Sequence, residues 1–98
     1  MSREAYLRPE AREDLRDAAT WYEGRDEGLG SDFIDEFLAC ISRIEEYPES
    51  YQLVDEGIRS AVLHRFPYAI FYSVEPSHIE VLSVLRCSRD PEVWRSRA

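Results

Sequence analysis

The chain contains no lysine, so its twelve Lys and Arg positions are all arginines. Cysteine is also scarce: Cys40 and Cys87 are the only two, and they lie far apart in the sequence. No apolar run reaches the ~18–20 residues of a membrane-spanning helix, and the first residues lack the apolar core of a signal peptide. We therefore expect a cytoplasmic protein without membrane contact, whose two thiols stay free.

Motifs for several kinds of chemistry are missing as well. The sequence has no glycine-rich phosphate loop and no hydrolase nucleophile elbow. His64 and His78 stand alone, without the ligand spacing of a zinc site. The sequence therefore predicts neither a metal ion nor a cofactor, and we expect the acidic side chains of the helices to be solvated surface.

The charge is divided unevenly along a chain whose 98 residues fit one domain, residues 1–98. The net charge of −8 is the wrong sign for a protein that binds nucleic acid over its whole surface. Residues 1–56 hold six arginines and sixteen acids, a net of −10, whereas residues 57–98 hold six arginines and four acids, a net of +2. This asymmetry predicts an acidic back and a basic working face.

The first half of the chain reads as one short strand and two helices. Residues 4–8 form a candidate strand, and Pro9 is well suited to the first position of a helix that ends near Gly24. A second helix is predicted from Ser31 or Asp32, as the cap, through Glu46. Both have an apolar stripe at helical spacing, which is typical of helices that pack on a sheet. Residues 51–54 are expected only as an extended lead-in.

The second half reads as three strands, residues 57–66, Tyr68–Val74 and Ile79–Leu85, separated by proline-containing turns. Short connections predict an antiparallel meander with Tyr68–Val74 in the middle. A short final helix is expected over Pro91–Arg97, with Asp90 as its cap. The fold class is therefore α+β, with the order β-α-α-β-β-β, both helices on one face of a small, mostly antiparallel sheet, and the first strand at an unspecified edge.

Arginines and aromatic residues are the only candidates for a functional site. Guanidinium groups bind phosphate or carboxylate in two-pronged contacts, and aromatic rings stack on bases. The alternative is that each arginine pairs with one of the many carboxylates, and that Asp90-Pro91 only starts a helix. The strand layout predicts that Arg65 lies near Tyr68 and that Arg59 lies nearer the far end of the sheet. The candidates are Arg59, Arg65, Arg86, Arg89, Tyr68, Tyr72 and Trp94.

Three pieces of this region together resemble a known family. They are Arg59, the run Phe66-Pro67-Tyr68-x-Ile70-x-Tyr72, and the run Arg89-Asp90-Pro91-x-x-Trp94. At this spacing and in a chain this short, the sequence resembles the RelE/ParE superfamily of bacterial type II toxins, which includes plasmid stabilisation proteins. The resemblance covers nearly the whole chain. It implies the β-α-α-β-β-β fold and a cognate antitoxin partner, in a toxin–antitoxin hetero-oligomer.

The resemblance implies two alternative targets. In the ribosome-dependent mRNA-cleaving branch, Arg59, Arg65, Arg86 and Arg89 are the catalytic candidates. In the ParE-like branch, which poisons DNA gyrase by protein–protein contact, Tyr68, Tyr72, Arg86, Arg89 and Trp94 are the target-binding candidates. The cleaving branch typically has an arginine where this chain has Ala69, often a histidine where it has Arg86, and several lysines. These departures favour gyrase. A third hypothesis is a non-toxic module that only binds the antitoxin.

Overall fold

The computed structural model describes residues 3–98, and its elements follow the predicted order with one additional strand, β2. They are β1 (Ala5–Leu7), α1 (Pro9–Arg25), α2 (Leu29–Glu46), β2 (Gln52–Asp55), β3 (Ile58–Val62), β4 (Tyr68–Val74), β5 (Ile79–Arg86) and α3 (Glu92–Arg95). The α+β class and the placement of two long helices before a mostly antiparallel sheet are confirmed.

The strands form one sheet in the order β1-β5-β4-β3-β2. β4 lies between β3 and β5 and is antiparallel to both, as predicted for the middle strand of a meander. β1 pairs in parallel with β5 and so takes the edge that the sequence left undecided. β2 is a paired edge strand, antiparallel to β3, and not merely an extended lead-in. This register places Tyr68 opposite Arg86 and Tyr72 opposite Arg59.

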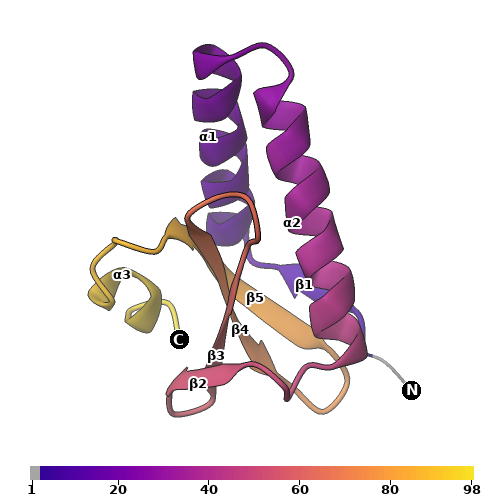
Figure 1. Ribbon diagram of the computed structural model, residues 1–98. Helices are drawn as coiled ribbons and strands as arrows, with labels where there is room; N and C mark the ends of the chain where they lie inside the picture. The colour runs from indigo at the N-terminus through magenta and orange to yellow at the C-terminus, as the bar shows by residue number, and fades with distance from the viewer. Residues whose placement is uncertain (1–2) are drawn as a thin grey trace.

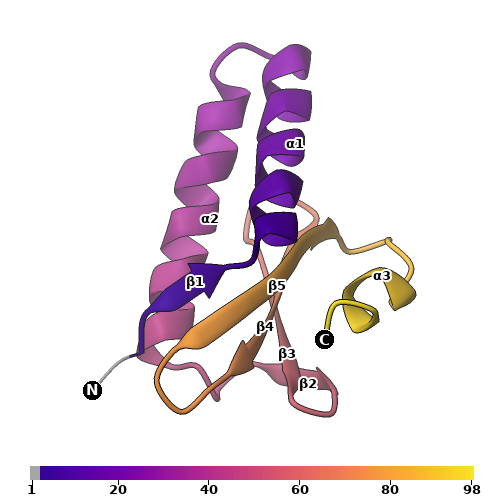
Figure 2. The ribbon, with the colours of Figure 1, turned by 180° about the vertical axis from the view of Figure 1, so that it is seen from behind.

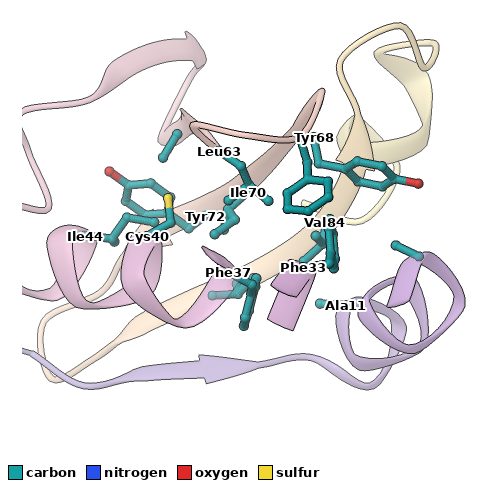
Figure 3. Close-up of a cluster of buried hydrophobic side chains, with 14 of the residues drawn as sticks. Ala11, Phe33, Phe37, Cys40, Ile44, Leu63, Tyr68, Ile70, Tyr72 and Val84 are labelled. Carbon is teal, nitrogen blue, oxygen red and sulfur yellow. The ribbon is translucent and has the colours of Figure 1, made fainter. Parts of the chain in front are cut away.

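The two long helices stand side by side and cover one face of the sheet, and their connected tips extend beyond it (Figure 1, Figure 2). Phe33, Phe37, Cys40 and Ile44 of α2 are buried in one cluster with Ile70 and other residues of the sheet (Figure 3). Because side chains alternate along a strand, the neighbours of Ile70 in β4 face the other way. That second face carries a smaller core, which α3 covers.

The start of α2 differs from the prediction. The helix begins at Leu29, with Gly28 at the cap position, and not at Ser31 or Asp32. Gly28 has a φ of 89°, a left-handed conformation that glycine adopts without steric cost. The carboxylate of Glu23 in α1 accepts hydrogen bonds from the backbone N–H groups of Gly28 and Gly30 at 3.0 Å each. A side chain from the preceding helix therefore supplies the cap that we expected from Ser31 or Asp32.

Two further elements, β3 and α3, are shorter than predicted. β3 ends at Val62 and not at Phe66, because the N–H of Leu63 bonds to the carbonyl of Tyr68 at 2.9 Å and closes the connection to β4. The final helix spans only Glu92–Arg95, with Pro91 at its cap position. Asp90 still stabilises this turn, since its carboxylate accepts a hydrogen bond from the N–H of Glu92 at 3.0 Å.

Candidate functional site

The four candidate arginines do not form one cluster. Arg59 lies near the start of β3, at the end of the sheet away from Arg86. There its guanidinium donates to the carbonyls of Glu49 and Tyr51, at 3.2 and 2.6 Å. Arg65 lies in the β3–β4 connection and pairs with Asp32 of α2 at 3.6 Å. Both therefore have partners within the protein, as the ion-pair alternative predicted for Arg65. Only Arg86 and Arg89 remain together.

Arg86 and Arg89 line a cleft of about 350 Å³ between α1 and the end of β5. We call it the α1–β5 cleft, and its lining residues are Asp14, Asp17, Ala18, Trp21, Tyr68, Val84, Leu85, Arg86 and Arg89. β5 ends at Arg86, and the N–H of Cys87 bonds to the carbonyl of Pro67 at 2.8 Å, which fixes where the basic segment leaves the sheet.

Trp21 is the largest aromatic surface in the cleft. Trp21 is 48% exposed, although α1 buries its neighbouring stripe of Ala11, Ala18 and Tyr22 against the rest of the protein. The guanidinium carbons of Arg25 and Arg86 lie 4.8 and 5.6 Å from the centre of its ring. Arg86 also lies 5.6 Å from the ring centre of Tyr68, its partner across the strands. These cation–π contacts hold Arg86 over the aromatic floor while its charge remains available.

The two walls of the cleft carry opposite charges. Asp14 and Asp17 come from α1, and Arg86 and Arg89 come from the end of β5. Within residues 3–98, no carboxylate oxygen lies within 4 Å of a guanidinium nitrogen of Arg86 or Arg89. Six other arginines also lack an ion pair in this range, so this alone does not distinguish Arg86 and Arg89. What distinguishes them is that they lie together in a cleft whose lining includes Trp21 and Tyr68.

Asp14 is already engaged within the protein. Its carboxylate pairs with Arg97 at 2.6 Å and accepts a hydrogen bond from the N–H of Val84 at 3.0 Å. The side chains of Asp14 and Arg97 are only 13% and 20% exposed. Asp14 therefore ties α1 to β5 and to the C-terminal segment, and Asp17 is the more accessible acid of this wall.

Tyr72 and Trp94, predicted to contact a target, are both buried in the core. Tyr72 has no exposed surface, and its hydroxyl donates to the carbonyl of Pro48 at 2.6 Å (Figure 3). Trp94 is 5% exposed and stacks on Phe71, with ring centres 4.9 Å apart. A partner cannot reach these rings in this conformation, so we assign both a structural role. Their aromatic character made them conspicuous in the sequence, but it serves packing.

Tyr68 lies at the boundary between the core and the cleft. Its ring packs edge-on against Phe33 and Tyr22, with ring centres 5.1 and 6.0 Å apart, while the residue is 9% exposed. Burial raises the pKa of Tyr22, the nearby Tyr68 adds to this, and the guanidinium of Arg86 opposes it. The cleft floor is thus continuous with the main core and should be rigid.

The residues of α1 that line the cleft were not among the candidates predicted from the sequence. Asp14, Asp17, Ala18 and Trp21 follow one another at i, i+3, i+4 and i+7, so they share one face of the helix. A tryptophan among acids on that face was the available signal. The pattern alone does not separate Trp21 from the core, because Ala11, Ala18 and Tyr22 mark the buried stripe and Trp21 lies next to it.

A second hollow of about 400 Å³ surrounds Arg59 at the opposite end of the sheet. Arg3, Glu49, Leu53 and Glu75 are among its lining residues. Because the guanidinium of Arg59 is bonded to backbone carbonyls here, this hollow offers less free positive charge than the α1–β5 cleft.

The described part of the chain shows neither a metal cluster nor a membrane helix. Residues 3–98 contain no group of three or more histidine, cysteine, aspartate or glutamate side chains placed to hold a metal ion. Within the same range, no helix combines the length and hydrophobicity needed to cross a bilayer. The cleft itself offers guanidinium, carboxylate, phenol and indole groups, a set suited to binding an anion beside a flat apolar group.

Comparison with known proteins identifies the family. A family model described as "ParE toxin of type II toxin-antitoxin system, parDE" matches residues 6–91. Among solved structures, the "Chromosomal ParDE TA system from P. aeruginosa" superposes with a TM-score of 0.74 over 87% of this chain and 96% of that chain. At 16% sequence identity, this likeness supports the fold alone. No match was found among curated proteins. The chain therefore belongs to the ParE family of type II toxins, within the RelE/ParE superfamily.

Proposed function

We propose that this protein, as a single toxin domain over residues 1–98, arrests growth by binding DNA gyrase and is neutralised by a cognate antitoxin. The observation that carries the proposal is the match to the ParE family over residues 6–91, since the ParE-like branch acts by protein–protein contact. The "ParDE TA system" in the name of the structural neighbour is consistent with an antitoxin partner.

The placement of the arginines supports contact over catalysis. Metal-independent RNA cleavage needs several groups converging on one phosphate. Here Arg59 and Arg65 are bound elsewhere, and Arg86 occupies the place where the cleaving branch often has a histidine. Arginine cannot act as a general base, because its pKa lies far above neutrality. A protein-binding surface requires none of this convergence.

We assign the target contact to the α1–β5 cleft. Tyr68, Arg86 and Arg89 stay in the proposed surface, and Trp21 joins them because it is exposed beside Arg86. Tyrosine, tryptophan and arginine are the residue types that dominate protein–protein interfaces. Tyr72 and Trp94 are left out because they are buried.

A second candidate function, ribosome-dependent mRNA cleavage, is favoured by one observation. Trp21 and Tyr68 beside Arg86 make an aromatic and basic surface of the kind that stacks on single-stranded bases. Against it, Asp17 in the cleft wall and the net charge of −8 repel a polyanion.

Expression of the chain alone from a tightly controlled promoter tests both candidates. Growth, the DNA-damage response and mRNA integrity are read from the same culture, and purified protein is added to a gyrase supercoiling assay. We expect growth arrest, a damage response, intact mRNA and inhibited supercoiling. Arrest with cleaved mRNA and unimpaired supercoiling would establish the second candidate instead. Normal growth would leave the non-toxic antitoxin-binding module.

A further inference from the structure

The α1–β5 cleft has a charge pattern that specifies its occupant. One wall carries the acid Asp17 and the carboxylate of Asp14, which is already paired with Arg97, and the other wall is basic, from Arg86 and Arg89. Between them lies an aromatic and aliphatic floor that includes Trp21 and Val84. A ligand that fills the cleft must therefore place negative charge toward the end of β5 and uncharged, apolar surface on the floor.

We propose that the α1–β5 cleft binds a short acidic peptide segment of the antitoxin, with a carboxylate on Arg86 and Arg89 and a large apolar side chain against Trp21. This inference rests on the proposed function only in naming the antitoxin as the source of the segment. It implies that the antitoxin neutralises the toxin by occupying the surface that we assign to the target.

The basic wall is preorganised for a carboxylate. Arg86 is held by two aromatic rings, Trp21 and Tyr68, and needs no rearrangement to present its remaining N–H donors. The N–H of Arg89 bonds to the carbonyl of Arg86 at 3.0 Å, so the two residues belong to one tight turn. A carboxylate accepts two parallel N–H bonds from a guanidinium, which favours an acidic side chain over a neutral one.

The size of the cleft favours a segment over a large ligand. Its volume of about 350 Å³ lies at the lower end of the range of about 300–1,000 Å³ for ligand pockets. It has room for a few side chains of an extended or helical segment. The exposed ring of Trp21 supplies the kind of aromatic contact around which interface energy concentrates.

The same charges disfavour RNA as the occupant. A nucleic acid carries one negative charge per nucleotide, so a strand that binds Arg86 also brings charge to Asp17 in the cleft and to a protein with a net charge of −8. A peptide can confine its acids to the few positions beside the arginines. The two arginines attract a few acidic side chains, whereas the net negative charge of the protein repels a long anionic ligand. A short segment with few acids therefore fits the cleft best.

The test uses the full chain and two blocked hexapeptides, Leu-Phe-Ser-Ser-Asp-Glu, with one acid for each of the two arginines, and its neutral analogue Leu-Phe-Ser-Ser-Asn-Gln. Binding is followed by tryptophan fluorescence, which reports on Trp21 because the other tryptophan, Trp94, is buried. We expect the acidic peptide to bind about tenfold more tightly than the neutral one at low salt. The advantage should shrink as salt is added, because the cleft is partly exposed.

A matched pair of double variants locates the effect. Arg86→Gln with Arg89→Gln should abolish the preference for the acidic peptide. Arg12→Gln with Arg16→Gln changes the net charge equally at two exposed positions of α1 outside the cleft and should retain it. Circular dichroism checks that both variants fold. Equal affinity for the two peptides, no binding up to about 5 mM, or a preference that survives in the Arg86/Arg89 variant would overturn the inference.

A third ligand separates the two classes of macromolecule. Tighter binding of a uridine hexanucleotide than of the acidic peptide, lost in the Arg86/Arg89 variant, would assign the cleft to RNA and refute the peptide proposal. The growth assay is independent of these titrations. A chain that arrests growth but ignores the acidic peptide loses only this inference, whereas one that binds the peptide without inhibiting gyrase loses only the proposed target.

Discussion

At the scale of single residues, Gly30 shows how closely the two long helices pack. A Cβ atom built on Gly30 would lie 2.6 Å from the carbonyl oxygen of Ala19 and 3.0 Å from the Cβ of Glu23. The first of these neighbours is backbone and cannot move aside without shifting α1. Gly30 also donates its N–H to Glu23, so close approach and capping depend on the same residue.

Gly30→Ala should therefore destabilise the protein by about 1–3 kcal/mol, because the added methyl group forces α1 and α2 apart. The measurement is the free energy of unfolding from urea denaturation. Gly24→Ala is the matched control, since nothing lies within 4 Å of a Cβ at that helical position. It should stabilise the protein by about 0.5–1 kcal/mol. If both variants lost stability equally, steric contact at Gly30 would not be the cause.

Tyr72 makes the stability of the folded protein depend on pH in the alkaline range. Burial raises its pKa well above the ordinary tyrosine value of about 10, because the core disfavours a phenolate. The folded state thus prefers the protonated phenol. The contribution of the protonated Tyr72 side chain to the free energy of unfolding is therefore fully present below about pH 10 and is lost as the pH rises further. Burial also raises the pKa of Tyr22, which adds to the same loss.

We expect the urea midpoint to fall between about pH 9.5 and pH 11, and Tyr72→Phe to make that fall shallower. At pH 7 the variant should lose about 1–2 kcal/mol, because the carbonyl of Pro48 loses its hydrogen-bond donor. Tyr47→Phe, at an exposed ring, should cost less than about 0.5 kcal/mol at pH 7. An unchanged alkaline slope in Tyr72→Phe would contradict this assignment.

At the scale of secondary structure, the C-terminal segment depends on tertiary contacts. α3 has four residues and cannot be stable alone, since isolated helices shorter than about 12 residues are marginal in water. It is held by the stacking of Trp94 on Phe71 and by Arg97, which reaches Asp14 and the hydroxyl of Ser83 at 2.9 Å. Arg8 of the β1–α1 junction also donates to the carbonyl of Arg97. This segment is what covers the second face of the sheet.

Trp94→Ala should cost about 3 kcal/mol and expose that face, because the indole covers Phe71 and its neighbours. Two readouts are needed: the free energy of unfolding, and binding of a dye that recognises apolar surface. Arg95→Ala is the control in the same helix, since its ion pair with Asp55 is 44% exposed on both sides and should contribute about 0–1 kcal/mol. Full retention of stability in Trp94→Ala would mean that α3 is not needed to close the core.

At the scale of the whole molecule, charge is divided unevenly between the two halves of the chain. The first 56 residues, which contain both long helices and the strands β1 and β2, carry a net of −10, and the remainder carries +2. Several acids of the two helices, among them Glu10, Glu13, Asp35 and Glu46, are exposed to solvent, where like charges repel one another. Such repulsion destabilises the compact state and is screened by salt.

The melting temperature should therefore rise between about 20 mM and 0.5 M sodium chloride. Asp35→Asn with Glu46→Gln removes two exposed acids of α2 that have no ion-pair partner within residues 3–98, and it should reduce the rise. A melting temperature that falls with salt would show that attractive ion pairs outweigh the repulsion.

The sequence by itself determined the order of elements and much of their extent. The start of α1 at Pro9 and the spans of β4 and β5 follow from local signals, namely a proline at the first helical turn and runs of β-branched and aromatic residues. The motif around Phe66, Tyr68 and Arg89 also sufficed to indicate the family. These features are readable because they depend on a residue and its near neighbours in the chain.

Only the tertiary structure decided which distant residues meet. The parallel pairing of β1 with β5, the strand character of β2 and the capping of α2 by Glu23 all join segments whose contact no local pattern encodes. The candidate site differs from the prediction for the same reason. Arg59 and Arg65 contact other parts of the protein, and Trp21 lies beside Arg86. Burial and pairing depend on how the whole sheet and both helices pack, and a side chain's role depends on that packing as much as on its chemistry.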